Sequence, residues 1–590
     1  MKKTLLRGSC LLLMLVLLLP SFSGCAFGFR ASLQREFDML LEQTMLGMFQ
    51  GSEFNYKNAF RDPERYGLSY ETHQILDRSV LNAYTKSERD ARKKELKAAI
   101  AQLERINPIV LKKTQKPSYY ALLDYMKIEL KYIDVTDYSS LIAPSSGFIA
   151  NMGISFYEYP FDTKSDIEHY LAFLENIPDA LDTVITYTEQ KMDDMGYKVS
   201  KYIVNENVNY LKNYGDKESS PFVDGFADKI EAVTFLSDSV KQSFIVKNED
   251  ILSDIVFPAF DDCCAAMKSW KTASSKSLAE YEGGKEYYKY LLETGSGTDM
   301  SPEEMIIYLE EKYDYYYDII QNSSAAILNQ YMQSDYGINI QTPEKVIEML
   351  SEATQNRLPE IEDPGCCLTD LPASLSISGM LAYYVIPQVD SESSNVVRLN
   401  RGQLGQGKNL ALYLDTIAHE SYPGHLYQIN YWRQNGIHPL NNWMSFKAVS
   451  EGWADYIAHK SLNWVGISRA LNSVITADYM LTQIVTALAD IQVNYMGMNA
   501  NKMNAYICQK MNMNPSEKPF VYMYDVLTAD PGIYVPYAMG FLQVTDLETQ
   551  VGVELHGKYE DIDFYRAYLN AGSCSFASMK KLIYDELGIE

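Results

Sequence analysis

The sequence predicts a mainly α-helical fold that contains one small β-hairpin. Apolar residues recur every three or four positions from about Leu33 to Gln355, and this pattern returns from about Asn409 to the C-terminus. Between Leu375 and Asn400 the pattern is that of short strands instead. The 590 residues are 47% hydrophobic and 22% charged, a balance typical of packed globular proteins, so the chain can bury a sizeable core.

The first 25 residues have the pattern of an export signal. Three basic residues precede an apolar run, Leu11–Leu19, which is too short to span a bilayer as a permanent helix. The Ser-Gly-Cys sequence that ends at Cys25 resembles a bacterial lipobox, although Phe22 replaces the usual leucine. We therefore expect an extracytoplasmic lipoprotein anchored to the membrane through Cys25. An ordinary secreted protein is the alternative.

The helical region expected over residues 26–370 carries clear helix signals. Apolar residues at helical spacing define one buried face, namely Ile167, Tyr170, Leu171, Leu174, Ile177 and Leu181. Ser301 and Glu304 form a predicted capping box around Pro302, which marks the start of a helix. Residues 371–590 form the second region, and we expect both to belong to one integrated domain.

The β-hairpin is predicted within residues 375–400. A strand over Tyr383–Ile386 ends at Pro387, a polar turn follows over Asp390–Asn395, and Val396 begins the return strand. This small sheet would directly precede the helix that carries His419.

Charge and cysteine content exclude some functions. The net charge is −25. The charged residues of the predicted signal segment, residues 1–25, are all basic, so removal of this segment makes the chain still more acidic. Nucleic acid is therefore not an expected partner. Six cysteines remain after Cys10 and Cys25, and their possible disulfides cannot be paired from sequence. No catalytic role is assigned to them.

Histidine is scarce, yet four of the seven histidines lie between positions 419 and 459. His419 and Glu420 begin a segment that ends with Pro423-Gly424-His425, and Glu451 follows on a predicted helix over 446–462. Two imidazoles and one carboxylate are the usual ligands of a catalytic zinc ion, whose fourth position is left to water. The sequence therefore predicts one Zn²⁺ held by His419, His425 and Glu451.

The spacing of the two histidines requires a break in the helix. Six residues apart on a continuous helix, His419 and His425 would point about 240° apart around its axis. Pro423 cannot continue the hydrogen-bond ladder and Gly424 permits a reversal, so the chain can return His425 towards His419.

Two carboxylates near these ligands are assigned supporting roles. Glu420 is the expected general base, which activates water and passes the proton to the leaving amine. Asp455 follows Glu451 by one helical turn and is expected to orient a ligand histidine. Structural roles are favoured for His438, in a turn before Pro439, and for His459, expected at the surface.

These motifs resemble a large bacterial family known as domain of unknown function eight-eight-five, which is grouped with gluzincin-type metallopeptidases. Besides the His419–His425 segment and Glu451–Ala454, the resemblance covers Tyr170–Ala172 with Pro178, Gly284–Tyr288, Asn400, Tyr537 with Gly540, and Leu569 with Gly572. It implies a large helical gluzincin-like enzyme with a small sheet beside the metal-binding helix, one zinc ion and peptide substrates.

The chain departs from the family pattern at three positions. Asn494 and Tyr565 stand where the family has histidines, and Asp455 stands where an apolar residue is expected. Any role of those family histidines in binding substrate or stabilising a transition state is therefore not transferred to this chain.

Three further residues complete the predicted site. Tyr537 is a candidate second hydrogen-bond donor to the oxyanion. A tyrosine that serves only in packing is the alternative interpretation. Arg398 and Asn400, beside the hairpin, are candidates for binding the substrate backbone or a terminal carboxylate. Two alternatives remain open from sequence: a non-catalytic lipoprotein that binds peptides or other solutes, and a zinc hydrolase of a non-peptide amide or ester.

Overall fold

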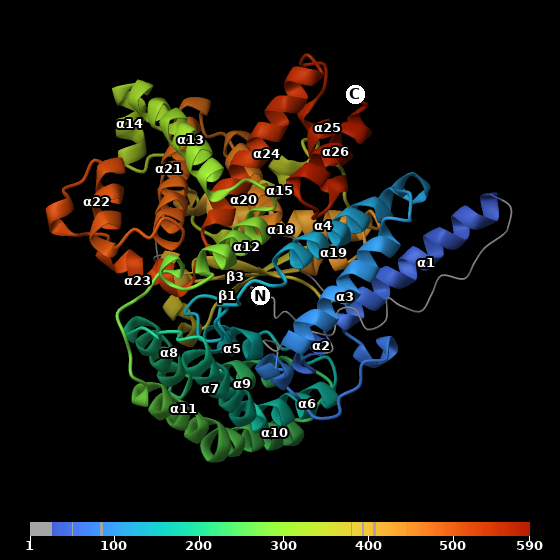
Figure 1. Cartoon of the computed structure of the whole chain (residues 1–590), viewed down its shortest axis with the longest axis vertical. Helices are drawn as coiled ribbons and strands as arrows, with labels where there is room; N and C mark the ends of the chain where they lie inside the picture. The colour runs from blue at the N-terminus through green and yellow to red at the C-terminus, as the bar shows by residue number, and fades with distance from the viewer. Residues whose placement is uncertain are drawn as a thin grey trace.

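The structure, a computed structural model, describes residues 26–49, 51–82, 86–378, 380–391, 395–404, 409–444 and 446–590. Within these residues the protein is mainly α-helical, and its strands form one three-stranded sheet (Figure 1). The predicted fold class is confirmed. The predicted signal segment, including Cys25, lies outside the described residues.

The first half of the chain is helical, as predicted. The N-terminal helices are α1 (Ala26–Gly47), α2 (Phe54–Ala59), α3 (Lys86–Leu103) and α4 (Lys116–Tyr132). The next seven helices form the lower lobe of Figure 1, and they are α5 (Phe148–Tyr157), α6 (Lys164–Glu175), α7 (Ile177–Asp194), α8 (Lys201–Tyr214), α9 (Asp224–Ala232), α10 (Asp238–Ile251) and α11 (Phe257–Ser269). A separate apolar core fills this lobe. Asn176 separates α6 from α7, and Pro178 lies in the first turn of α7, so the periodic segment from Ile167 to Leu181 spans two helices.

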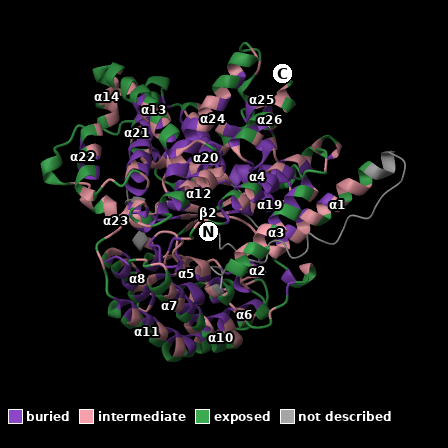
Figure 2. Ribbon diagram, in the orientation of Figure 1, coloured by how far each residue is buried: buried purple, intermediate pink, exposed green. Residues whose placement is uncertain are grey.

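The upper part of the molecule in Figure 1 contains the remaining helices. Those before the sheet are α12 (Gly284–Ser296), α13 (Pro302–Asn322), α14 (Ala325–Met332) and α15 (Pro343–Thr354). Those after it are α16 (Arg401–Leu404), α17 (Leu414–Glu420), α18 (His425–Gln434), α19 (Leu440–Trp443), α20 (Lys447–Trp464), α21 (Arg469–Asn494), α22 (Ala500–Lys510), α23 (Val521–Ala529), α24 (Val535–Glu554), α25 (Asp561–Ala571) and α26 (Phe576–Leu587). The buried residues in Figure 2 follow the inner faces of these helices.

The predicted helix start at Ser301 is confirmed. The Ser301 hydroxyl accepts a hydrogen bond from the Glu304 amide at 3.2 Å, and the Glu304 carboxylate accepts from the Ser301 amide at 2.8 Å.

The largest core takes side chains from both sides of residue 370, from Ala121 to Ile583. The predicted division of the chain at residue 370 stays a prediction.

The predicted hairpin is confirmed as strands β2 (Ala382–Val385) and β3 (Asn395–Leu399), which pair antiparallel. Strand β1 (Cys366–Asp370), which the sequence analysis missed, pairs parallel with β3 and places β3 in the centre of the sheet. Its side chains are mostly half-exposed, so it lacks the alternating pattern of a strand with one buried face. Strand β2 therefore forms the edge of the sheet that lies nearest to α17.

Helices α20 and α24 cross at a contact that only glycine permits. A Cβ atom on Gly452 would lie 2.5 Å from the carbonyl carbon of Gly540, and one on Gly540 would lie 2.3 Å from the Ala448 oxygen. Without side chains at these two positions the backbones approach closely. This approach brings Tyr537, one turn before Gly540, towards Glu451.

Helix α21 is long and apolar enough to cross a membrane by length and composition. However, 61% of its most apolar stretch is buried within the protein. Its buried side chains belong to the largest core, which accounts for their hydrophobicity.

A buried carboxylate on α21 makes the stability of the protein pH-dependent. Asp490 accepts hydrogen bonds from the Tyr288 hydroxyl at 2.7 Å, the Asn494 amide group at 2.9 Å and the Gly532 amide at 2.9 Å. Burial raises the pKa of Asp490 to about 7, although these donors oppose the rise. The native state therefore retains a proton that the unfolded chain loses above its ordinary pKa of 3.8.

We expect Asp490 to lower the free energy of unfolding by roughly 4 kcal/mol as the pH rises from about 4 to about 7. The sign follows because the native state binds more protons than the unfolded state within this window. Denaturant unfolding at a series of pH values, compared with Asp490→Asn, isolates this contribution from that of other groups. Equal pH dependence in the two proteins would contradict it.

Candidate metal centre

The helix that carries His419 breaks where the sequence predicts. Helix α17 ends at Glu420, and α18 begins at His425. In the turn between them the Gly424 amide donates to the Ala418 carbonyl at 3.0 Å, and a Cβ on Gly424 would lie 1.9 Å from the His419 oxygen. The turn thus folds back tightly onto α17 because residue 424 has no side chain. The two imidazole rings meet at a centroid distance of 4.6 Å and an interplanar angle of 88°.

Helix α20 supplies a carboxylate to the two imidazoles. The Glu451 Oε2 atom lies 3.3 Å from His419 Nε2 and 3.5 Å from His425 Nε2. Tetrahedral ligands at zinc distances of about 2.0–2.2 Å stand about 3.4 Å apart, and both distances from Glu451 to the imidazoles are close to this value. Their side chains are 14–18% exposed, so the site is partly accessible to solvent.

The predicted partner of His419 lies in place. Asp455 Oδ1 is 2.8 Å from His419 Nδ1, on the side of the ring opposite to Glu451. An imidazole that donates through Nδ1 presents Nε2 as a lone-pair ligand. Asp455 is buried, with its side chain 7% exposed, so this contact is protected from water.

Glu420 lies beside the three ligand atoms but makes a different contact. Its Oε1 atom is 3.9 Å from His419 Nε2, farther than Glu451, although one of its oxygens lies within 4.8 Å of both histidines. Its Oε2 atom accepts a hydrogen bond from the Tyr384 amide on strand β2 at 2.9 Å. The edge strand therefore orients Glu420, and Glu451 lies nearer to His419 Nε2 than Glu420 does.

The charges of the site favour a bound cation. Burial disfavours the charged form of His419, but Asp455, Glu451 and Glu420 outweigh it and raise the pKa of this imidazole well above its usual range. Burial also disfavours the Glu451 carboxylate, but His419, His425 and Lys447 outweigh it and lower its pKa well below the ordinary value. Three carboxylates around two imidazoles form a strongly negative cluster, which suits a divalent ion.

Tyr537 lies at this site, as predicted. Burial and the charges of Glu451, Asp455 and Glu420 raise the pKa of its hydroxyl well above the ordinary value, so it remains a hydrogen-bond donor. The Lys447 Nζ atom stands 4.4 Å from the centre of its ring and donates to the Ile533 carbonyl at 3.0 Å. Lys447, at the start of α20, thus packs on the Tyr537 ring in the first turn of α24.

Arg398 lies on β3, and Asn400 directly follows this strand. Both side chains donate hydrogen bonds to other groups of the protein. Arg398 makes two 2.8 Å hydrogen bonds to the Glu158 carboxylate and one of 2.6 Å to Thr369. The buried Asn400 amide group donates to the carbonyls of Ser376 and Met380. Both residues join the sheet to neighbouring segments, and their proposed contact with substrate stays a prediction.

The other histidines in the cluster have structural surroundings. His459 is buried, only 4% exposed, which corrects the expected surface position. Its ring packs 4.7 Å from Tyr479, and Nδ1 lies 3.3 Å from the Thr476 hydroxyl. His438 accepts a hydrogen bond from the Leu440 amide and lies 3.6 Å from Glu42. The six cysteines of the described chain are free thiols.

Three features of the site escaped the sequence analysis. The Tyr384 amide orients Glu420, Lys447 covers Tyr537, and the Trp453 indole donates to the Pro423 carbonyl at 3.3 Å. Trp453 lies two positions beyond Glu451, within the Glu451–Ala454 motif, so the sequence could have indicated that it belongs to the site. A backbone amide has no sequence signature, and Lys447 resembles any solvated lysine at the start of a helix.

Comparison with known proteins places this chain in a family. A family model described as "Bacterial protein of unknown function (DUF885)" matches residues 65–583. No curated protein matches the sequence.

Two solved structures share the fold. One, described as a candidate lipoprotein from Colwellia psychrerythraea, aligns with a TM-score of 0.74 and 16% identity over 94% of this chain and 99% of that chain. Another, a candidate lipoprotein of unknown function from Shewanella oneidensis, aligns with a TM-score of 0.57 and 15% identity over 95% of this chain and 100% of that chain.

Proposed function

The chain belongs to this bacterial family of unknown function, DUF885, and from its site geometry we propose that it is a zinc-dependent hydrolase of peptide bonds. The observation that carries the proposal is the spacing of 3.3 and 3.5 Å between Glu451 and the two histidines. Such spacing suits tetrahedral zinc, and Glu420 stands outside the ligand set as a carboxylate available for proton transfer.

Each residue of the site would have a distinct role in this reaction. A zinc ion held by His419, His425 and Glu451 would supply a Lewis acid and a water of lowered pKa. Glu420, oriented by the Tyr384 amide, takes a proton from the attacking water and delivers it to the leaving nitrogen as the C–N bond breaks. Tyr537 donates a hydrogen bond to the negative oxygen that develops on the scissile carbonyl.

Asp455 is proposed to orient His419 for the metal. Asp455→Ala is expected to weaken zinc affinity or turnover by about 10–100-fold, because His419 Nδ1 loses its acceptor. Competition with a chelator measures the affinity, and Asp318→Ala on the surface of α13 is the matched control. Unchanged zinc affinity and turnover would remove the role of Asp455.

Tyr537 is proposed as the second donor to the oxyanion. Tyr537→Phe keeps the ring against Lys447 but removes the donor, so kcat is expected to fall about 10²-fold or more with little change in KM. Steady-state kinetics on one peptide substrate measure both constants. Normal turnover in this variant would assign Tyr537 to packing alone.

We also propose that the protein is exported and anchored through Cys25. The sequence pattern of residues 1–25 supports this, and two proteins of the same fold are described as candidate lipoproteins. Mass spectrometry of the mature N-terminus tests it. An acylated Cys25 supports the anchor, whereas an unmodified N-terminus at another residue indicates ordinary secretion.

The central experiment combines metal analysis of the purified protein with digestion of a peptide library. We expect one zinc ion per chain, cleavage that a chelator abolishes, and recovery when zinc is restored. Absence of zinc would overturn the metal site. Zinc without peptide cleavage would favour a binding lipoprotein, and cleavage of ester or other amide substrates instead would redirect the reaction class.

A further inference from the structure

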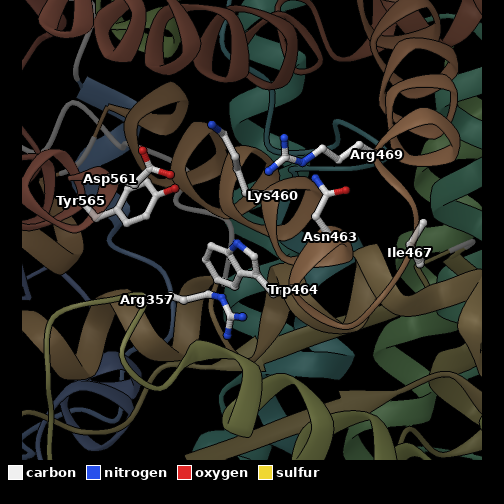
Figure 3. Close-up of a pocket in the computed structure, with 8 residues that line it drawn as sticks. All are labelled: Arg357, Lys460, Asn463, Trp464, Ile467, Arg469, Asp561 and Tyr565. Carbon is white, nitrogen blue, oxygen red and sulfur yellow. The ribbon is translucent and has the colours of Figure 1, made fainter. Parts of the chain in front are cut away.

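A cavity lies at the far end of α20, the helix that carries Glu451. It has a volume of about 460 Å³, which is in the size range of small-molecule sites. Four segments line it: the chain after α15, the end of α20, the start of α21 and the start of α25 (Figure 3). We call it the Trp464 pocket, after the indole in its wall.

The Trp464 pocket is separate from the metal centre. Lys460 follows Glu451 by nine residues on α20, which corresponds to about 13 Å along the axis and about 180° around it. The pocket therefore lies on the opposite face of this helix, and a ligand in it does not occupy the candidate catalytic site.

The charge of this pocket is opposite to that of the whole protein. The chain has a net charge of −25, yet three of the four charged residues in the pocket wall are basic, namely Arg357, Lys460 and Arg469, against Asp561. Lys460 forms an ion pair of 2.9 Å with Glu548. Within the described part of the chain, neither Arg357 nor Arg469 forms an ion pair with a carboxylate.

The Trp464 pocket has a polar end and, apart from it, a flat apolar surface. The Arg357 guanidinium stands 5.9 Å from the Trp464 ring and donates to the Ala353 carbonyl, so it packs against the indole. In Figure 3 the heads of Lys460 and Arg469 gather on the other side of Trp464. A ligand could thus place an oxyanion at Arg469 and Lys460 and a ring against the indole.

We propose that the Trp464 pocket binds a small aromatic acid, with its carboxylate or phosphate at Arg469 and Lys460 and its ring at Trp464. Guanidinium and ammonium groups bind such oxyanions through charge-assisted hydrogen bonds. The indole supplies a flat apolar surface for the ring. An acidic protein that concentrates basic groups at one cavity attracts anions to that cavity.

Calorimetric titration of the purified full chain tests this site without reference to hydrolysis. The probes are phenyl phosphate, benzoate, inorganic phosphate and neutral benzyl alcohol. We expect saturable binding of phenyl phosphate and benzoate, weaker binding of inorganic phosphate and none of benzyl alcohol. Equal affinity for inorganic and phenyl phosphate would overturn the role of the ring, and no saturable binding of either aromatic acid would overturn the site.

Variants locate the binding. Arg469→Glu and Asn463→Asp, both at exposed positions of the pocket wall, are expected to weaken binding of phenyl phosphate by about tenfold or more. Trp464→Phe should remove the ligand-induced change in tryptophan fluorescence. The control Lys271→Glu reverses an exposed charge at the end of the lower lobe and should leave affinity unchanged. Affinity unaltered in both pocket variants would place the ligand elsewhere and overturn the proposal.

Discussion

Replacing Glu420 by glutamine is expected to lower kcat by about 10²–10⁴-fold while leaving the zinc content unchanged. Glutamine has the same shape and can still accept the hydrogen bond from the Tyr384 amide, so the local structure is retained. It cannot take a proton from water. Single-turnover cleavage of one defined peptide, with metal analysis of the same preparation, measures both quantities.

The matched control for this substitution is Glu311→Gln on the exposed face of α13, which removes an equal charge far from the site in sequence. It should retain full turnover. Undiminished cleavage by Glu420→Gln would show that another group is the base. Loss of zinc in Glu420→Gln would instead make Glu420 part of the ligand set, contrary to the distances that favour Glu451.

Replacing Gly424 by alanine is expected to abolish stoichiometric zinc binding and to destabilise the fold by about 3 kcal/mol. The added Cβ would lie 1.9 Å from the His419 oxygen and 2.5 Å from the Ala418 oxygen, both of them backbone atoms. The turn between α17 and α18 must then open, which moves His425 away from His419. Zinc analysis and denaturant unfolding of the purified variant measure the two effects.

Gly552→Ala on α24 provides the control for the glycine change. A Cβ at Gly552 meets only the Tyr559 side chain, at 3.4 Å or more, so the helix accepts alanine. Zinc content should be unchanged and stability equal or slightly higher. Full zinc content in Gly424→Ala would mean that the close approach of this turn to α17 does not decide the metal geometry.

Features encoded by nearby residues could be predicted from the sequence. Helical periodicity and the Ser301 capping box depend on contacts within a few positions, as does the β2–β3 hairpin, so they form as expected. The placement of His419 beside His425 follows from the Pro423-Gly424 break, and Asp455 follows Glu451 by one turn. The candidate ligands therefore lie in two short segments with recognisable spacing.

Features that depend on distant segments were decided by the tertiary structure alone. Strand β1 is a strand because it pairs with β3, and Arg398 binds Glu158, which lies 240 residues away in the chain. The burial of His459 depends on the packing of other helices around it. Such contacts result from the packing of many elements together, so no local sequence pattern predicts them.

The candidate metal centre depends on both local sequence and tertiary packing. The residue types and the helix break come from the sequence of residues 419–425 and 447–464. The approach of Glu451 to both imidazoles, the crossing of α20 and α24 at Gly452 and Gly540, and the orientation of Glu420 by a backbone amide come from packing. Sequence determines which ligands are available, and tertiary structure decides their distances, because those distances depend on how whole helices and a strand pack together.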